Sequence, residues 1–167
     1  MIPHQGANRV AEHDPDQMMD RFELLCRQRG GRMTAKRRAV LGKLLAEKRP
    51  LSAYELLDML RPDDPSATPM SVYRSLDFLV EHGLVHRLET TKSFMACAHP
   101  DHAHAAPFLI CRQCGTVVEA EDDRVAAAAE SLSDRLGFAL DHRTIELTGT
   151  CQSCKETAVG GKKAGAF

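Results

Sequence analysis

The chain has 167 residues, of which 43% are hydrophobic and 27% charged, and its formal net charge at pH 7 is −1. This composition is typical of a soluble globular protein with one domain or two small ones. No apolar run approaches the roughly 18 residues of a membrane helix, and residues 1–16 lack the apolar core of a signal peptide. We therefore expect a cytoplasmic protein, whose reducing surroundings favour metal binding by paired cysteines over disulfides.

Positive charge is concentrated in one part of the chain. Between Arg27 and Arg49 there are nine Lys or Arg residues and a single acid, Glu47. After Glu119 the balance turns acidic. One part of the molecule is thus suited to a polyanion such as nucleic acid, although a solvated helical surface would give the same pattern.

Apolar residues in the first half recur at helical spacing and predict four helices. The last three have candidate N-caps at Thr34, Ser52 and Thr68. Ser52 and Glu55 match the capping-box pattern, and Pro69 takes the first position of the fourth helix. The predicted inward faces, in chain order, are Met18, Phe22 and Leu25; Val40, Leu41, Leu44 and Leu45; Ala53, Leu56, Leu57 and Leu60; and Val72, Leu76, Leu79 and Val80.

Short alternating runs replace the helical pattern after residue 85. Helices followed by such a strand, turn and strand are typical of a winged helix-turn-helix. The second half reads as two strands, a helix and a last strand, at 107–111, 116–120, about 123–136 and 138–148. The helix is predicted to bury Val125, Ala129, Leu132 and Leu136.

We therefore predict an α+β fold with two domains. A winged helix-turn-helix domain at 17–97 is joined by a hinge linker, 98–106, to a small αβ domain at 107–154. The ends, residues 1–16 and 155–167, mix Gly, polar and charged residues without periodicity, which predicts disorder.

Two C-x2-C pairs, Cys111/Cys114 and Cys151/Cys154, give the strongest chemical signal. Four thiolates fill the tetrahedral shell of one Zn²⁺ and leave no place for substrate, so this site is predicted to be structural. It would clamp the end of the chain in a unit too small for a deep core. The alternative is a thiol–disulfide exchange motif, which places its first cysteine at a helix N-terminus, whereas both pairs here are predicted to end strands.

A second cluster of potential metal ligands surrounds the predicted linker. Loop histidines are usually just solvated, so composition and spacing leave open whether this cluster is a metal site. Its candidate ligands are Cys97, His86 across the predicted hairpin, Glu119, and one or two of His99, His102 and His104.

The motifs "TPMSVYRSLDFLVEHGLVHRLE", "SFMAC", "FLICRQCGTVVE" and "FALDHRTIELTGTCQSC" resemble the ferric-uptake-regulator family of metal-sensing repressors, and within it the zinc-uptake regulators. The resemblance covers about residues 17–154. It implies a DNA-binding winged helix, a C-terminal dimerisation domain, and two Zn²⁺ per protomer. The implied structural ligands are Cys111, Cys114, Cys151 and Cys154, and the implied regulatory ligands are His86, Cys97, His104 and Glu119.

The function implied by this resemblance is that of a zinc-responsive repressor. It would bind double-stranded operator DNA as a homodimer when its regulatory site is filled, and so control genes of zinc uptake and homeostasis. No enzymatic activity, membrane or small-molecule substrate is expected. A zinc enzyme would need a ligand position open for water, which four protein ligands close. A zinc-stabilised adaptor that binds protein and not DNA is a further alternative.

The same fold could sense another signal, namely iron, manganese or peroxide. Iron-sensing members carry a contiguous "HHDH" run before the first cysteine pair, whereas here Pro100 and Phe108 interrupt it, which also makes His102 a rival to His104. One thiolate and two imidazoles suit zinc, and with the carboxylate they give a neutral site that is easier to bury. These ligands therefore favour zinc over iron.

The fourth predicted helix carries the candidate for sequence readout. At about 100° per residue, Arg74 points away from the buried stripe, as on a recognition helix in the major groove. Arginine can bind guanine O6 and N7 with two hydrogen bonds, although a solvated surface arginine fits the pattern as well. Ser71, Tyr73, Tyr54 and Arg37 are further candidates for contacts to phosphate or bases.

Overall fold

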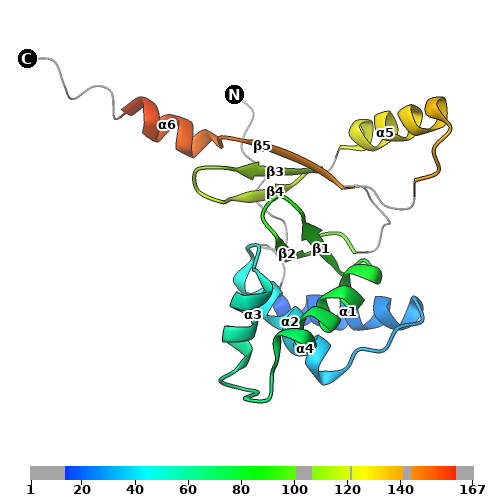
Figure 1. Ribbon diagram of the computed structural model, residues 1–167, viewed down its shortest axis with the longest axis vertical. Helices are drawn as coiled ribbons and strands as arrows, with labels where there is room; N and C mark the ends of the chain where they lie inside the picture. Colours follow the sequence, from blue (N-terminus) through cyan, green and yellow to red (C-terminus); the bar gives the residue numbers. More distant parts are fainter. Residues whose placement is uncertain (1–13, 101–106, 121, 141–143, 161–167) are drawn as a thin grey trace, which may run out of the picture. The chain divides into compact units, whose positions relative to one another are not determined.

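The computed structural model describes residues 14–100, 107–120, 122–140 and 144–160 (Figure 1). These residues fall into two compact units, which divide between Pro100 and Pro107. The α+β class and the winged-helix order of elements are confirmed. Within the described ranges, no helix has the length and apolarity needed to cross a membrane.

The first unit contains four helices and a two-stranded antiparallel hairpin, in which Val85 pairs with Ala96 and Leu88 with Ser93. An additional backbone pair joins Leu51 to Phe94, with N···O distances of 2.9 and 2.8 Å, so the segment before the third helix extends this wing. The elements are α1 Pro15–Gln28, α2 Ala35–Glu47, α3 Ala53–Leu60, α4 Pro69–Glu81, β1 Val85–Leu88 and β2 Ser93–Ala96.

Helix α1 begins earlier than the sequence predicted. Residues 1–13 of the predicted tail lie outside the described residues, but Pro15 and Asp16 are helical. The Asp14 carboxylate caps the helix by accepting a hydrogen bond from the Asp16 N–H at 3.0 Å. Proline is also pre-organised for the first helical position, and these two local signals outweigh the polar composition.

The predicted caps of the next three helices are confirmed. Thr34 caps α2 by accepting from the Arg37 N–H, and Thr68 caps α4 through Ser71. At α3 the capping box is complete, since Ser52 Oγ accepts from the Glu55 N–H at 3.2 Å and the Glu55 carboxylate from the Ser52 N–H at 2.8 Å. Satisfying these orphan donors fixes where each helix starts and therefore which face it buries.

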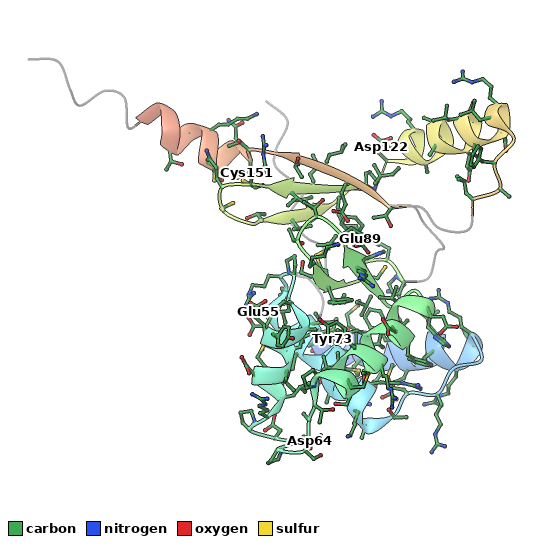
Figure 2. The ribbon with its side chains drawn as sticks, in the orientation of Figure 1. Glu55, Asp64, Tyr73, Glu89, Asp122 and Cys151 are labelled. Atoms are coloured by element: carbon green, nitrogen blue, oxygen red, sulfur yellow. The ribbon has the colours of Figure 1, made fainter. Side chains whose placement is uncertain are left out.

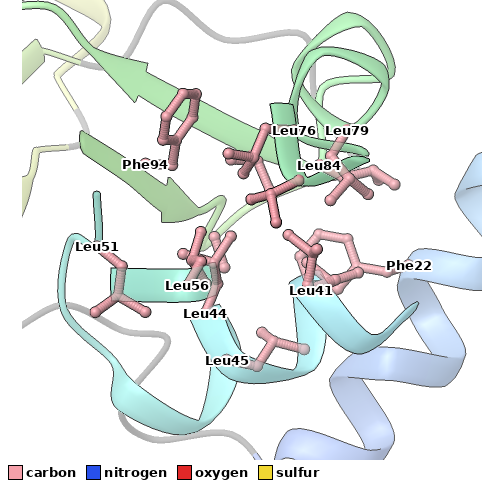
Figure 3. Close-up of a cluster of buried hydrophobic side chains, with 14 of the residues drawn as sticks. Phe22, Leu41, Leu44, Leu45, Leu51, Leu56, Leu76, Leu79, Leu84 and Phe94 are labelled. Atoms are coloured by element: carbon pink, nitrogen blue, oxygen red, sulfur yellow. The ribbon is translucent and has the colours of Figure 1, made fainter. Parts of the chain in front are cut away.

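A single hydrophobic core holds the first unit together (Figure 3). Leu41, Leu76 and Leu84 have no exposed surface and come from α2, α4 and the start of the wing. All predicted inward residues of α2 and α3 are buried. Leu25 and Val80 are only partly buried, because each lies at the edge of its helix's apolar face.

Helix α4 ends in a tight turn that leads directly into the wing. Gly83 adopts a positive φ of 64°. The Gly83 N–H donates to the Val80 carbonyl and the Leu84 N–H to the Leu79 carbonyl, both at 2.9 Å, which is the Schellman pattern. A glycine permits this left-handed conformation without steric cost, so α4 and β1 are joined without a flexible loop.

The second unit is a three-stranded sheet with two helices. Its strand order is β4-β3-β5, with β3 antiparallel to β4 and parallel to β5. The elements are β3 Pro107–Cys111, β4 Val117–Glu119, α5 Asp123–Leu136, β5 Ile145–Gly149 and α6 Gln152–Gly160. The predicted strands at 107–111 and 116–120 are therefore found, whereas the last strand starts at Ile145 and not at 138.

The apolar face of α5 is not buried as the sequence predicted. Leu132 is 48% exposed and Leu136 is 61% exposed, and Val125 and Ala129 are half-buried. Helical periodicity identifies an apolar face but not the surface that covers it. Within one chain, the described residues leave this face largely uncovered.

The segment after the second cysteine pair is helical, although disorder was predicted from residue 155. The Lys155 N–H donates to the Cys151 carbonyl at 3.0 Å, and Gln152 donates to Glu156 at 2.8 Å one turn along the helix. Gln, Lys, Glu and Ala are good helix formers, and the glycines that suggested disorder begin only at the last residue of α6, Gly160. Residues 161–167 of the predicted tail lie outside the described ones.

The burial of Leu76 predicts a strong effect on the stability of the first unit. Leu76→Ala removes a side chain with no exposed surface and should lower the free energy of unfolding by about 2–5 kcal/mol. Urea denaturation followed by circular dichroism measures this change. Asp77→Ala, next to it on the exposed face of α4, is the control and should stay within about 0.5 kcal/mol.

Candidate metal centres and nucleic-acid interface

Four thiols converge in the second unit where β3 and β5 end. Cys111 ends β3 and Cys114 follows in the turn to β4. Cys151, labelled in Figure 2, lies directly before α6, and Cys154 lies in the first turn of that helix. All four Sγ atoms lie within 4.8 Å of one another. The Sγ–Sγ distance is 3.9 Å from Cys111 to Cys154 and 3.7 Å from Cys114 to Cys151.

These separations fit the ligand shell of one tetrahedral metal ion. With zinc–sulfur bonds of about 2.3 Å, the sulfurs of a regular tetrahedron lie about 3.8 Å apart. All four cysteines are free thiols. Four thiolates are soft donors that select ions such as Zn²⁺ over oxygen-seeking cations, so the residues present fit a closed zinc site.

Backbone N–H groups prepare this cluster for a cation. The N–H groups of Cys151, Cys114 and Gln113 point at the Cys111 sulfur and lower the pKa of its thiol to about 6. In contrast, the neighbouring sulfurs of Cys151 and Cys114 raise the pKa of Cys154 to about 12. The fold therefore favours the thiolate of Cys111 but opposes that of Cys154, because neighbouring thiolates repel each other. A divalent cation at the centre would offset that repulsion.

Thr116 is a residue of this cluster that the sequence analysis missed. Its Oγ1 lies 3.2 Å from the Cys114 Sγ, and hydrogen bonding to Thr116 lowers the pKa of that thiol. A hydroxyl residue two positions after a cysteine pair, in the turn that returns to the sheet, is a signal that could have identified it.

The start of α6 bears on the alternative of thiol–disulfide exchange. The prediction that both cysteine pairs end strands is wrong for the second pair, since Cys151 directly precedes a helix. Exchange, however, takes place between the two cysteines of one C-x2-C motif. Here the sulfurs of both motifs lie together, all four within 4.8 Å of one another, as expected for four ligands of one ion.

Two predicted regulatory ligands lie together on the wing of the first unit. His86 is in β1 opposite Met95, and Cys97 directly follows β2. An imidazole nitrogen of His86 and the Sγ of Cys97 lie within 4.8 Å of each other. Cys97 is 1% exposed, and its N–H donates to the Leu84 carbonyl at 3.0 Å, so the hairpin holds the thiol in place.

The other predicted regulatory ligands do not belong to the wing. Glu119 belongs to the second unit, where it ends β4 opposite Phe108. His102 and His104 lie outside the described residues, so the choice between them stays a prediction. His99 is half-buried in the segment that follows Cys97.

Arg74 is exposed on α4, opposite the buried Val72, Leu76 and Leu79. Tyr73, labelled in Figure 2, is 40% exposed beside it, and Tyr54 near the start of α3 is 65% exposed. All three side chains are exposed on the first unit. Such groups provide hydrogen bonds and stacking surfaces for a nucleic acid.

The structure gives the other two candidates local partners. Ser71 Oγ accepts from the Thr68 N–H at 3.0 Å and donates to the Thr68 carbonyl at 2.8 Å, so its hydroxyl serves the helix cap. The Arg37 guanidinium lies 3.4 Å from the centroid of the Phe78 ring and donates to the Arg32 carbonyl at 2.6 Å. Both are therefore engaged in holding α4 and α2.

Comparison with known proteins agrees with this architecture. Residues 28–148 match the Ferric uptake regulator family. The chain belongs to the ferric uptake regulator family. The zinc uptake regulation protein of Escherichia coli (strain K12) is 40% identical to it over 141 residues, which is 84% of this chain and 82% of that protein.

Within this family, the peroxide-responsive repressor PerR of Staphylococcus aureus (strain USA300) is 27% identical over 130 residues, 78% of this chain and 86% of that protein. A solved structure described as a zinc uptake regulator complexed with zinc and DNA is 38% identical and has a TM-score of 0.82. The match covers 88% of this chain and 99% of that one. The similarity to zinc regulators is thus higher than that to this peroxide-responsive repressor.

The four-thiol cluster leads to a prediction about metal content and folding of this family member. Cys114→Ser removes one of four ligands and should release the tightly bound zinc, because three remaining thiols hold the ion more weakly. Since metal binding and folding of so small a unit are linked, the thermal unfolding of 107–160 should become less cooperative. Atomic absorption and differential scanning calorimetry measure both effects.

Cys26→Ser is the matched control, because Cys26 is a buried thiol in α1, in the other unit. It should keep the zinc content of the parent protein. Retention of full zinc by purified Cys114→Ser would contradict the four-thiolate site.

Proposed function

We propose that this chain is a zinc-responsive transcriptional repressor. It binds operator DNA as a homodimer when a regulatory zinc site is filled, and controls genes of zinc uptake and homeostasis. This proposal is carried by one observation: the same winged-helix unit contains an exposed arginine-bearing helix and, on its wing, a His86–Cys97 pair whose ligand atoms lie within 4.8 Å of each other. The similarity to two zinc uptake regulators over more than four-fifths of the chain supports it.

In this proposal each protomer holds two zinc ions. Cys111, Cys114, Cys151 and Cys154 keep one permanently, and His86, Cys97, His104 and Glu119 take up the other as the signal. One thiolate and one carboxylate neutralise the dication, and imidazoles complete a borderline-soft donor set that suits zinc. The first ion supplies structural stability and the second supplies the switch.

The proposed regulation is a linkage between metal and DNA. His86 and Cys97 belong to the reading unit and Glu119 to the pairing unit, so ligands from both, held by one ion, fix the angle between them. In a two-fold dimer that angle sets the separation of the two α4 helices, which must match half-sites about 34–36 Å apart or a multiple of it. By reciprocity, operator DNA tightens zinc binding, with a coupling of about 1–3 kcal/mol.

The homodimer follows from the apolar surface of the second unit. Leu132 and Leu136 on α5, and Phe138 after it, are 48%, 61% and 69% exposed. Contiguous apolar surface of this kind on a small unit indicates a protein interface. A second copy would cover it in an isologous contact, which gives the two-fold symmetry that paired half-sites require.

Sequence readout is assigned to Arg74, and the exposed Tyr73 and Tyr54 are further candidates for DNA contacts. Ser71 and Arg37 contribute mainly by positioning α4, given their local hydrogen bonds. No enzymatic step is part of this function, and its site of action is the cytoplasm, where the DNA is. A sensor of iron, manganese or peroxide is the alternative signal on the same fold, and the thiolate at Cys97 favours zinc.

The regulatory site is tested by metal stoichiometry. The parent protein should bind two zinc ions per protomer, of which a mild chelator removes one. Cys97→Ser should bind one and remain a folded dimer, but lose zinc-dependent operator binding, because the switch is gone while the scaffold ion remains. Zinc titration, size-exclusion chromatography and gel-shift assays under anaerobic conditions give the three readouts.

Cys26→Ser is again the control, since it changes another buried thiol of the same unit. Zinc-dependent operator binding by Cys97→Ser would contradict the ligand assignment. If iron or manganese induced operator binding when free zinc is too low to fill the site, the signal would be that metal and not zinc.

Arg74 leads to a separate prediction about sequence readout. Arg74→Ala should weaken specific operator binding by about 1–3 kcal/mol and relax the preference at one base pair, since a two-bonded guanine contact is lost. Fluorescence anisotropy with single-base operator variants measures this. Arg49→Ala is the charge-matched control, because Glu47 and Glu55 already pair with Arg49 at 3.4 and 3.0 Å. Equal losses in the two variants would reduce Arg74 to a phosphate contact.

A further inference from the structure

One side chain joins the end of the arginine-bearing helix to the segment that follows the regulatory cysteine. The Arg29 guanidinium donates through Nη1 to the His82 carbonyl at 2.5 Å and through Nη2 to the Pro100 carbonyl. His82 is the C-cap of α4, and Pro100 lies three residues after Cys97. The two carbonyls are far apart in sequence, and Arg29, the C-cap of α1, bridges them.

The backbone around this bridge is closely packed against α4. A Cβ added to Gly31 would lie 2.5 Å from His82 Nε2 and 2.8 Å from Phe78 Cζ, so a larger residue there would have to displace these rings. The His82 ring stacks on Phe78 with centroids 3.9 Å apart. A Cβ at Gly83 would lie 3.0 Å from Nη1 of Arg29. The end of α4 therefore has little room to move without displacing the segment at 29–31.

Arginine is chemically suited to this position. The carbonyls at a helix C-terminus lack intrahelical partners and carry partial negative charge, which a cation complements. The guanidinium presents several N–H donors in a fixed plane, so two carbonyls can be held at a set separation. A lysine ammonium carries the same charge but lacks this planar arrangement of several N–H donors.

We propose that Arg29 is a positioning residue that transmits the filling of the regulatory zinc site to α4. The inference rests on the proposed function, in which Cys97 is a zinc ligand. An ion bound at Cys97 restrains the backbone that continues through Ala98 and His99 to Pro100. Arg29 holds the Pro100 carbonyl and the α4 C-cap together, so a restraint on Pro100 also orders the C-terminal end of α4. Because α4 is then already ordered, it loses less conformational entropy when it binds DNA.

A purely structural brace would behave differently. Its loss would loosen α4 equally with and without the regulatory zinc, so the change that zinc produces would stay the same. A transmitting residue is recognised because its loss removes the zinc-dependent difference.

The experiment is hydrogen–deuterium exchange of the full-length dimer, followed on a peptide that spans residues 76–84, with the regulatory site empty and filled by Zn²⁺. In the parent protein zinc should slow exchange of this peptide, and in Arg29→Gln it should not. Arg27→Gln, two residues earlier in α1, is the matched control: it removes the same charge, and the Arg27 side chain is 74% exposed and pairs with Glu23 on the same helix at 3.7 Å. Arg29→Lys, which keeps the charge, should retain only part of the zinc effect.

The same proteins are compared in operator binding. Zinc should raise the operator affinity of the parent and of Arg27→Gln by the same factor, and Arg29→Gln should lose about tenfold of that enhancement. Zinc content, with one structural ion retained, verifies folding. If Arg29→Gln does not fold, Arg29→Lys carries the test.

The outcomes separate the two proposals. Equal zinc protection of 76–84 in the parent and Arg29→Gln overturns the role of Arg29, as does no zinc protection in the parent. Zinc protection that depends on Arg29, without zinc-dependent operator binding, supports the role of Arg29 and overturns the proposed function.

Discussion

The position of α4 is the constraint on which the first unit depends. Its N-terminus is fixed by the cap at Thr68 and its C-terminus by the turn at Gly83. Between them the buried Leu76 locks the rotation of the helix about its axis, and that rotation is what turns Arg74 outward. The proposed DNA-reading face therefore follows from core packing and capping, neither of which involves DNA.

The second unit depends on a different interaction, because its sheet is small and the apolar side chains of α5 stay exposed. Hydrophobic burial within one chain cannot supply the usual share of its stability. Four thiols instead meet where β3 and β5 end, and the raised pKa of Cys154 indicates how much their mutual repulsion calls for a cation. A metal ion at this cluster and a partner subunit over α5 would complete a unit that one chain alone leaves unfinished.

Local signals explain what could be predicted from the sequence. The caps at Thr34, Ser52 and Thr68 and the inward faces of α2 and α3 depend on neighbours a few positions away. Helix α6 was missed because it begins within three residues of a strand and its glycine-rich continuation dominated the composition. The bridge at Arg29 could not be predicted, since its partner at Pro100 is 71 positions away, and long-range carbonyl contacts leave no mark in residue type.

The wing places the candidate sensing thiol next to the helix it would control. The Cys97 N–H donates to the Leu84 carbonyl, and the Leu84 N–H donates to the Leu79 carbonyl within α4. Two hydrogen bonds, through Leu84, thus connect Cys97 to α4. A second connection runs through Arg29, which bridges the Pro100 and His82 carbonyls. Because both routes end at the C-terminal turn of α4, the proposed restraint at Cys97 would act on that end of the helix. It would order the C-terminal turn, while the cap at Thr68 and the packing of Leu76 keep the exposed face around Arg74 as it is.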